Sequence, residues 1–273
     1  MKAYGLPGRV VLAGVALLCP AWAEDVLVIE QDYNLVRSDK EGVEAKDIRQ
    51  RMFISRNMVR IDEFGGESKQ PTESFLIDLK QRLIVNLDHG DMTKLVETFE
   101  QRAARIELRK QKVLGDLQAL DGPQKEKVEK LYRALLDDER SFEMVQDKDK
   151  VDVNGVECRR IRIVDRKNPD YEPMVLALHP KKEMPYDSAE VLYLLQIVGG
   201  NMREFLNQNK AKLKQVPMAM TVDLAAGGTL KVKVVNLEET TTDKLDPALF
   251  LIPDYKDRSP RPPRKERKVD GGQ

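Results

Sequence analysis

The sequence predicts an α+β protein built on an antiparallel β-sheet, with an αα-hairpin inserted between its strands. Two observations lead to this class. Apolar and polar residues alternate through several short segments that turn residues separate, which is the period of half-buried strands. Between about residues 98 and 140 that period is lost, and good helix formers carry an approximate helical stripe instead.

The N-terminus has the features of a secretory signal peptide. Lys2 and Arg9 precede a short apolar run over residues 10–18, and the small residues of "AWA" end at Ala23. The run is too short to span a bilayer. We therefore expect residues 1–23 to be removed and the mature chain to be exported, to the periplasm. Cys19 offers the alternative of a lipoprotein signal, although Leu18 stands where such a signal normally has a small residue.

Composition excludes some classes of partner and cross-link. Lysine and arginine number 46 and aspartate and glutamate also number 46, so nothing indicates a nucleic-acid binder. After removal of residues 1–23, Cys158 is the one remaining cysteine, so no internal disulfide is expected. We expect Cys158 to be a buried structural thiol. The alternative is a reactive thiol or one that pairs with a cysteine of another molecule. No later stretch is apolar for long enough to span a membrane.

The N-terminal half predicts five or six short strands in an antiparallel meander. The alternating segments are "VLVIEQDYNLV", "DIRQRMFIS", "NMVRIDE", "SFLIDL" and "LIVNL", with turns at "SDKEG", "GGESKQP" and "DHGD". Two helices follow. Phe99, Ile106 and Val113 mark the first, "DGP" ends it, and Pro123 opens the second.

The C-terminal half returns to strands. These are "VNGVECRRIRIV", "MVLALHP", "VPMAMTVDL" and "TLKVKVVNLEE". A third helix is expected over residues 185–210, with Asp187 or Ser188 as its N-cap and a break or kink at Gly199–Gly200. We expect one domain over residues 24–256 with the hairpin at 98–140 inserted in it. Residues 257–273, rich in Pro, Arg and Lys, are expected to form a disordered basic tail.

This order of elements resembles the LolA-like superfamily of periplasmic half-barrel proteins. The resemblance is carried by "RMFISRNMVRID", "SFLIDLKQRLIVNLDHGDMTKLVE", "LDGPQKEKVEKLYRALL", "VNGVECRRIRIV" and "LDPALFLIPDYK". More narrowly, the chain is similar to a domain-of-unknown-function branch with a helical-hairpin insertion and a closing F-x-x-P-x-Y segment, here Phe250, Pro253 and Tyr255. The resemblance implies a curled antiparallel sheet covered by helices, with an apolar space between them that holds lipid or lipoprotein acyl chains.

Six apolar residues are the candidate lining of that space. They lie on the third helix and the late strand: Leu192, Leu195, Ile197, Met218, Met220 and Val222. An ordinary dry core is the alternative for these residues. The corresponding functions are a carrier or sensor of an acyl chain, or a non-catalytic envelope interaction module that uses the helical hairpin and basic tail. A deep apolar cavity would favour the first, and a filled core with an exposed apolar stripe on the hairpin would favour the second.

The sequence offers little chemistry for an enzyme, and we predict no catalytic residue, no metal site and no cofactor. His89, in "DHGD", and His179, in "LHPKK", are the only histidines, and both are expected at exposed loop ends. The "DHGD" residues suit a hairpin loop with Gly90 at positive φ better than a metal site. No H-E-x-x-H, G-x-S-x-G, C-x-x-C or phosphate-binding glycine loop occurs. A hydrolase would need a cleft that holds a histidine beside a nucleophile.

Overall fold

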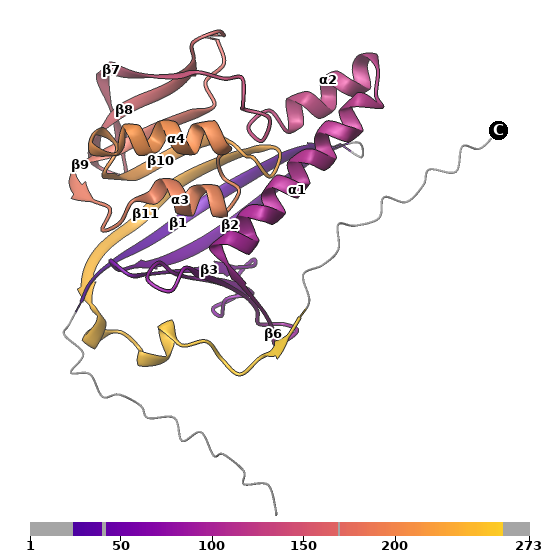
Figure 1. Cartoon of the computed structure of the whole chain (residues 1–273). Coiled ribbons are helices and arrows are strands. Elements are labelled where there is room, and N and C mark those ends of the chain that lie inside the picture. Colours follow the sequence, from indigo (N-terminus) through magenta and orange to yellow (C-terminus); the bar gives the residue numbers. More distant parts are fainter. Residues whose placement is uncertain (1–23, 40–41, 169, 259–273) are drawn as a thin grey trace, which may run out of the picture.

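The computed structural model describes residues 24–39, 42–168 and 170–258, and these form an α+β protein (Figure 1). The expected signal peptide, and residues 259–273 of the expected tail, lie outside them. Within the described residues a 12-stranded mixed sheet combines with four α-helices. The α+β class predicted from the sequence is therefore confirmed.

Two antiparallel meanders make up the sheet. The first comprises β1 (Asp25–Asp39), β2 (Gly42–Ile54), β3 (Met58–Phe64), β4 (Glu73–Asp78), β5 (Leu83–Asp88) and β6 (Thr93–Thr98). The second comprises β7 (Phe142–Val153), β8 (Val156–Asp165), β9 (Met174–Glu183), β10 (Gln215–Asp223) and β11 (Thr229–Thr241). They join where β1 pairs with β11, so the strand order is β12-β6-β5-β4-β3-β2-β1-β11-β10-β9-β8-β7.

The short strand β12 (Lys256–Asp257) makes the sheet mixed. It pairs in parallel with β6, whereas the pairs formed by the other strands are antiparallel. The sequence predicts an antiparallel sheet without this strand. Two residues show no alternation, so no pattern could indicate β12.

Helix α1 (Phe99–Gln118) begins directly after β6, and α2 (Gly122–Leu131) follows it before β7. Thr98 and Gln101 form a capping box at the start of α1, which satisfies two backbone N–H groups of the first turn. Gly122 takes a left-handed conformation, with φ +55°, where α1 gives way to α2. Pro123 lies in the first turn of α2, as the sequence predicts.

The expected third helix is two helices, α3 (Ser188–Leu194) and α4 (Gly200–Gln208). Asp187 caps α3, accepting a hydrogen bond from the amide of Ala189 at 3.2 Å. Helix α3 already ends at Leu194, five residues before the predicted glycines, and Gly199 is the N-cap of α4, so the break covers residues 195–199. Three short 3₁₀ helices complete the helical elements: Lys210–Lys212, Thr242–Lys244 and Pro247–Phe250.

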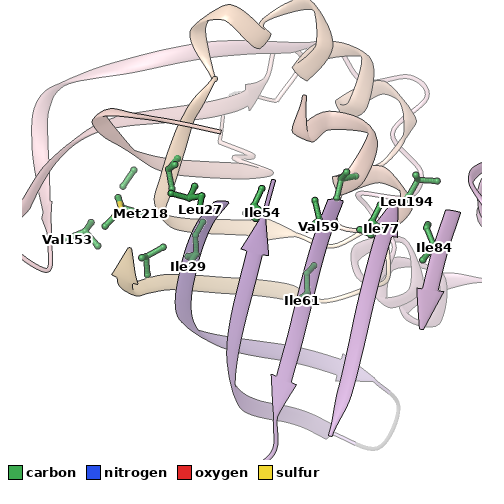
Figure 2. Close-up of a cluster of buried hydrophobic side chains, with 14 of the residues drawn as sticks. Leu27, Ile29, Ile54, Val59, Ile61, Ile77, Ile84, Val153, Leu194 and Met218 are labelled. Carbon is green, nitrogen blue, oxygen red and sulfur yellow. The ribbon is translucent and has the colours of Figure 1, made fainter. Parts of the chain in front are cut away.

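The main core lies between the sheet and the helices. Figure 2 shows its side chains on one face of neighbouring strands, with Leu27 and Ile29 of β1 beside Ile54 of β2 and with Leu194 of α3 across from the sheet. The alternate residues of each strand supply this face, as the period of two predicts. A second cluster joins β8–β11 to α3 and α4 through residues that include Ile163, Leu176, Val198 and Met202.

The opposite face of β3–β5 is covered by the C-terminal segment, residues 245–258. Tyr255 packs against Leu76, Val85 and Leu87 there. Arg60 of β3 donates a hydrogen bond to the carbonyl oxygen of Leu249, and the amide of Lys256 donates to the Met92 carbonyl at 3.1 Å. This part of the sheet is therefore buried on both faces.

Candidate ligand-binding site

A cavity of about 690 Å³ lies between the sheet and the helices α3 and α4. Its sheet side is formed by alternate residues of several strands, among them Ile29 and Leu35 of β1, Met52 of β2 and Leu178 of β9. Most of its lining side chains are aliphatic or aromatic. The volume lies within the range of about 300–1,000 Å³ that is typical of small-molecule sites.

The helical side of the cavity comes from α3 and the turn that follows it. Ala189, Val191 and Leu192 contribute from α3, and Leu195, Gln196 and Ile197 from the turn. Gln196 takes a left-handed conformation, with φ +59°, so the chain reverses sharply between α3 and α4.

Two arginines of α1 hold this side in place. Arg102 donates through Nε to the carbonyl oxygen of Leu194 at 2.9 Å, at the C-terminal end of α3. Arg109 donates to Oε1 of Gln196 at 2.6 Å and to the carbonyl oxygen of Ala226 at 2.8 Å. Helix α1 thus fixes the turn that forms part of the cavity wall.

The N-terminus of α4 is fixed by the chain between α2 and β7. The buried carboxylate of Asp137 accepts from the amide of Met202 through Oδ2 at 2.9 Å, which caps α4 from a remote part of the sequence. Burial raises the pKa of Asp137, partly offset by this hydrogen bond. The Asn201 side chain donates to the carbonyl oxygens of Asp137 and Asp138 at 2.8 and 2.7 Å.

The six residues named as candidate lining fall into two groups. Leu192, Leu195, Ile197 and Met220 line the cavity and are half-buried. Met218 and Val222 are not among the lining residues.

Met218 and Val222 belong to packed clusters instead. Met218 lies in the main core with Val216, next to an irregularity in the β9–β10 register between Pro217 and Ala219. Val222 lies in the second cluster, which includes Met202 of α4.

Sequence reasoning missed a polar row on the sheet side of the cavity. Gln31, Gln50 and Glu63 line it from β1, β2 and β3, and Tyr33 lies beside them. Each of the three occupies a position that alternation assigns to the apolar face, since Ile29, Met52 and Ile61 lie two residues away. A polar residue that interrupts an otherwise apolar face was the signal that could have found them.

His89 lies in the turn after β5, as expected, but it is not exposed, which corrects that part of the expectation from the sequence. It is half-buried on the face under the C-terminal segment, where Nε2 lies 2.8 Å from the hydroxyl oxygen of Ser74 and Nδ1 lies 2.9 Å from that of Tyr255. Ser74 donates its hydroxyl proton to Asp62, which also pairs with Arg60 at 2.6 Å.

Because the Ser74 hydroxyl donates to Asp62, its oxygen accepts from Nε2 of His89, and Nδ1 then accepts from the Tyr255 hydroxyl. Burial first, and then the positive charge of Arg60, lower the pKa of His89, while Asp62 and Asp88 act in the opposite direction. Ser74 has no exposed surface. This serine–histidine pair therefore fastens the C-terminal segment and gives a substrate no access to the hydroxyl.

The "DHGD" segment forms a turn, in which Oδ1 of Asp88 accepts from the amide of Asp91 at 3.0 Å. The positive φ of this turn falls on Met92, at 51°, and not on Gly90 as the sequence analysis expected. Among the residues that the structure describes, no group of three or more His, Cys, Asp or Glu side chains is arranged to hold a metal ion.

The other histidine also differs from the expectation. His179 lies within β9 and is half-buried, and its Nδ1 accepts from the amides of Lys181 and Lys182 at 3.0 and 2.8 Å. Cys158 is buried in the main core, and burial raises its pKa, as expected of a structural thiol.

The fold and the cavity together define an α+β protein with an apolar cavity between its sheet and its helices. No protein-family model matches the chain, and no curated protein matches it. None of the helices in the described ranges has the length and apolar character needed to cross a membrane.

Solved structures resemble this one at low TM-scores. An uncharacterized conserved protein from Thermus thermophilus is 8% identical with a TM-score of 0.41, over 85% of this chain and 89% of that one. A putative outer membrane lipoprotein-sorting protein domain from Vibrio parahaemolyticus is 9% identical with a TM-score of 0.32, over 82% and 88%. A LolA superfamily protein from Nitrosomonas europaea is 10% identical with a TM-score of 0.28, over 80% and 86%. The superfamily that the sequence resembles is thus represented among the structural neighbours.

Proposed function

We propose that this protein binds a hydrophobic ligand, a lipid or lipoprotein acyl chain, in the cavity between the sheet and α3–α4. The observation that carries the proposal is the cavity of about 690 Å³, partly open to solvent and lined from both sides by mostly apolar side chains. An ordinary dry core would fill this space, because protein interiors pack with few voids larger than a water molecule.

The energetics suit a carrier or a sensor. Burying an acyl chain contributes about 0.8 kcal/mol per CH₂ group. The same chain is already buried when it lies in a bilayer, so transfer between membrane and cavity is close to balanced. The half-buried Met52 and Met220 in the lining are flexible and adapt to the shape of a chain.

Export and the half-barrel architecture, which the N-terminus and the resemblance predict, are part of the same proposal. The chain is exported to the periplasm by residues 1–23, the sheet acts as a curled half-barrel, and α1 and α2 are a hairpin inserted into it. Leu192, Leu195, Ile197 and Met220 contact the ligand. The role of the protein is transport or sensing of the ligand, without catalysis.

A second candidate function is an envelope interaction module that uses α1. Leu108 and Leu114 on this helix are 69% and 37% exposed, which leaves apolar surface for a protein partner. The two lie six residues apart and so do not share a helical face, which weakens this candidate.

The test is native mass spectrometry of protein purified from the periplasm without detergent, followed by organic extraction of bound material. We expect a stoichiometric lipid or acylated peptide in the wild type. Leu192→Trp fills the cavity from α3 and should reduce the bound fraction, whereas Leu108→Trp makes the same change at an exposed site and should not. The contrary result is a wild type that shows only the mass of the protein without ligand, unchanged after incubation with phospholipid vesicles. That result would refute the binding proposal and favour the interaction module.

A further inference from the structure

The polar row on the cavity wall is set by strand register. Gln31 of β1 pairs directly with Gln50 of β2, and Gln50 pairs directly with Glu63 of β3. Residues that pair directly across strands project from the same face of a sheet. The three side chains therefore cross the floor of the cavity in one line, amid aliphatic neighbours.

The hydrogen bonds along this row run in one direction. Gln31 donates to Oε1 of Gln50 at 2.7 Å, and Gln50 donates to Oε1 of Glu63 at 2.8 Å. The hydroxyl of Tyr33 donates to the same Glu63 oxygen at 2.9 Å. The row thus ends at the carboxylate of Glu63, where the neutral donors Gln50 and Tyr33 both bind Oε1.

The charges in the lining are otherwise balanced. Lys210 lies 3.7 Å from Asp187, Lys214 lies 2.6 Å from Glu183, and Arg102 lies 3.5 Å from Glu97. Among the residues whose side chains the structure places, which leaves out 37–39 and 42–46, no cation lies within 4.0 Å of Glu63 in such a pair. Glu63 therefore brings a negative charge to the cavity that two neutral donors hold and no cation of this part of the chain offsets.

We infer that the cavity takes an amphiphile whose apolar chain carries an ammonium group, and that this group binds Glu63. A ligand that fills the cavity displaces water from the carboxylate, and a desolvated charge without a partner is costly. An ammonium group supplies both the opposite charge and hydrogen-bond donors. A carboxylate on the ligand would meet like charge at the same place. This inference rests on the proposed function and adds the chemical class of the ligand.

The test compares three probes of equal chain length: dodecylamine, dodecanol and dodecanoate, each below its micelle concentration and near pH 7. Affinity is measured by titration calorimetry on the wild type, Glu63→Gln and Glu67→Gln. Glu63→Gln removes the charge from the cavity with little change in shape. Glu67→Gln makes the same change at an exposed residue outside the lining.

We expect the wild type to prefer the amine over the carboxylate by about tenfold or more, since a charge-assisted hydrogen bond is worth at least that factor. Glu63→Gln should reduce the preference to nearly none and leave the affinity for dodecanol unchanged, and Glu67→Gln should behave as the wild type. Without Lys2 and Arg9 the expected mature chain has a formal net charge of −2, which is too small to favour either ion strongly. Glu67→Gln changes this net charge as Glu63→Gln does, so the two variants separate nonspecific attraction from binding at Glu63.

Equal binding of the amine and the carboxylate by the wild type would overturn the inference and leave the proposed function standing. A preference for the amine that survives in Glu63→Gln would also overturn it. Failure of all three probes to bind the wild type would refute the proposed function and the inference together. The comparison of probes on the wild type is independent of how well any variant folds.

Discussion

Replacing Gly199 by alanine tests how tightly α4 is docked beside the cavity. A Cβ atom at this position would lie 2.1 Å from the carbonyl oxygen of Ala134 and 2.6 Å from Oδ2 of Asp137. Both distances are far below van der Waals contact, so the chain between α2 and β7 must move away from α4. That movement breaks the capping hydrogen bond from Met202 to Asp137.

The expected loss of stability follows from these two effects. Overpacking a buried site costs about 1–3 kcal/mol, and a lost hydrogen bond to a charged group costs about 1.5–3 kcal/mol. Gly199→Ala should therefore lower the free energy of unfolding by roughly 3–5 kcal/mol, which corresponds to a fall in Tm on the order of 10 °C for a chain of this size.

The assay is urea denaturation followed by circular dichroism, with Gly200→Ala as the matched control. Nothing lies within 4 Å of a Cβ at Gly200, which is the first residue of α4, so that variant should be as stable as the wild type or up to about 1 kcal/mol more stable. A Gly199→Ala protein that unfolds within about 0.5 kcal/mol of the wild type would refute the close approach described above.

Three further predictions concern other contacts. Because the pKa of His89 lies below its ordinary value of 6.5, the contribution of neutral His89 is fully present above pH 6.5 and is lost as the pH falls through the folded-state pKa. Hydrogen exchange at the amides that pair β12 with β6, corrected for intrinsic rates, should thus become faster as the pH is lowered from about 7.5 to about 5.5. In His89→Gln this pH dependence should disappear. The thiol of Cys158, which is buried and has a raised pKa, should react with a thiol reagent in urea and not in the native protein. Arg109→Leu should lower stability by about 1–3 kcal/mol in thermal unfolding, since Gln196 and Ala226 lose their donors.

Each of these has a clear contrary result. Exchange in β12 that responds equally to pH in the wild type and in His89→Gln would show that His89 does not hold the C-terminal segment. Rapid native labelling of Cys158 would contradict its burial. Lys112→Leu, which also replaces a cation by leucine but at an exposed position of α1, is the control for Arg109→Leu. If both variants lost the same stability, the loss would come from the change within helix α1 and not from the contacts of Arg109.

Much of the fold follows from alternation and capping, because both act over short distances in the chain. The strands around Phe75, Ile77, Val85 and Leu87 lie where their period of two predicts. The start of α1 was expected near Thr98, and the structure gives Thr98 as its N-cap. Such signals depend on a few neighbouring residues, so a single sequence carries them.

Contacts between distant parts of the chain could not be predicted in the same way. Asp137 caps α4 across 65 residues, and Arg60 binds the Leu249 carbonyl across 189. Nothing in the local sequence of either partner indicates the other. The cavity belongs to the same class, since an apolar residue on an inward face gives the same pattern whether it meets a side chain or a void.

The pairing of β1 with β11 has a consequence for how the protein folds. Asp25 pairs with Thr241, so residues near the two ends of the described chain meet in the middle of the sheet. During synthesis one edge of β1 stays unpaired until β11 has been made, so the first meander is incomplete until then. An open strand edge is a template for pairing with other chains, and closure of so long a loop is slow. The centre of the sheet is thus closed only after both meanders have been made, and a chain kept unfolded until then avoids the period in which that edge is exposed.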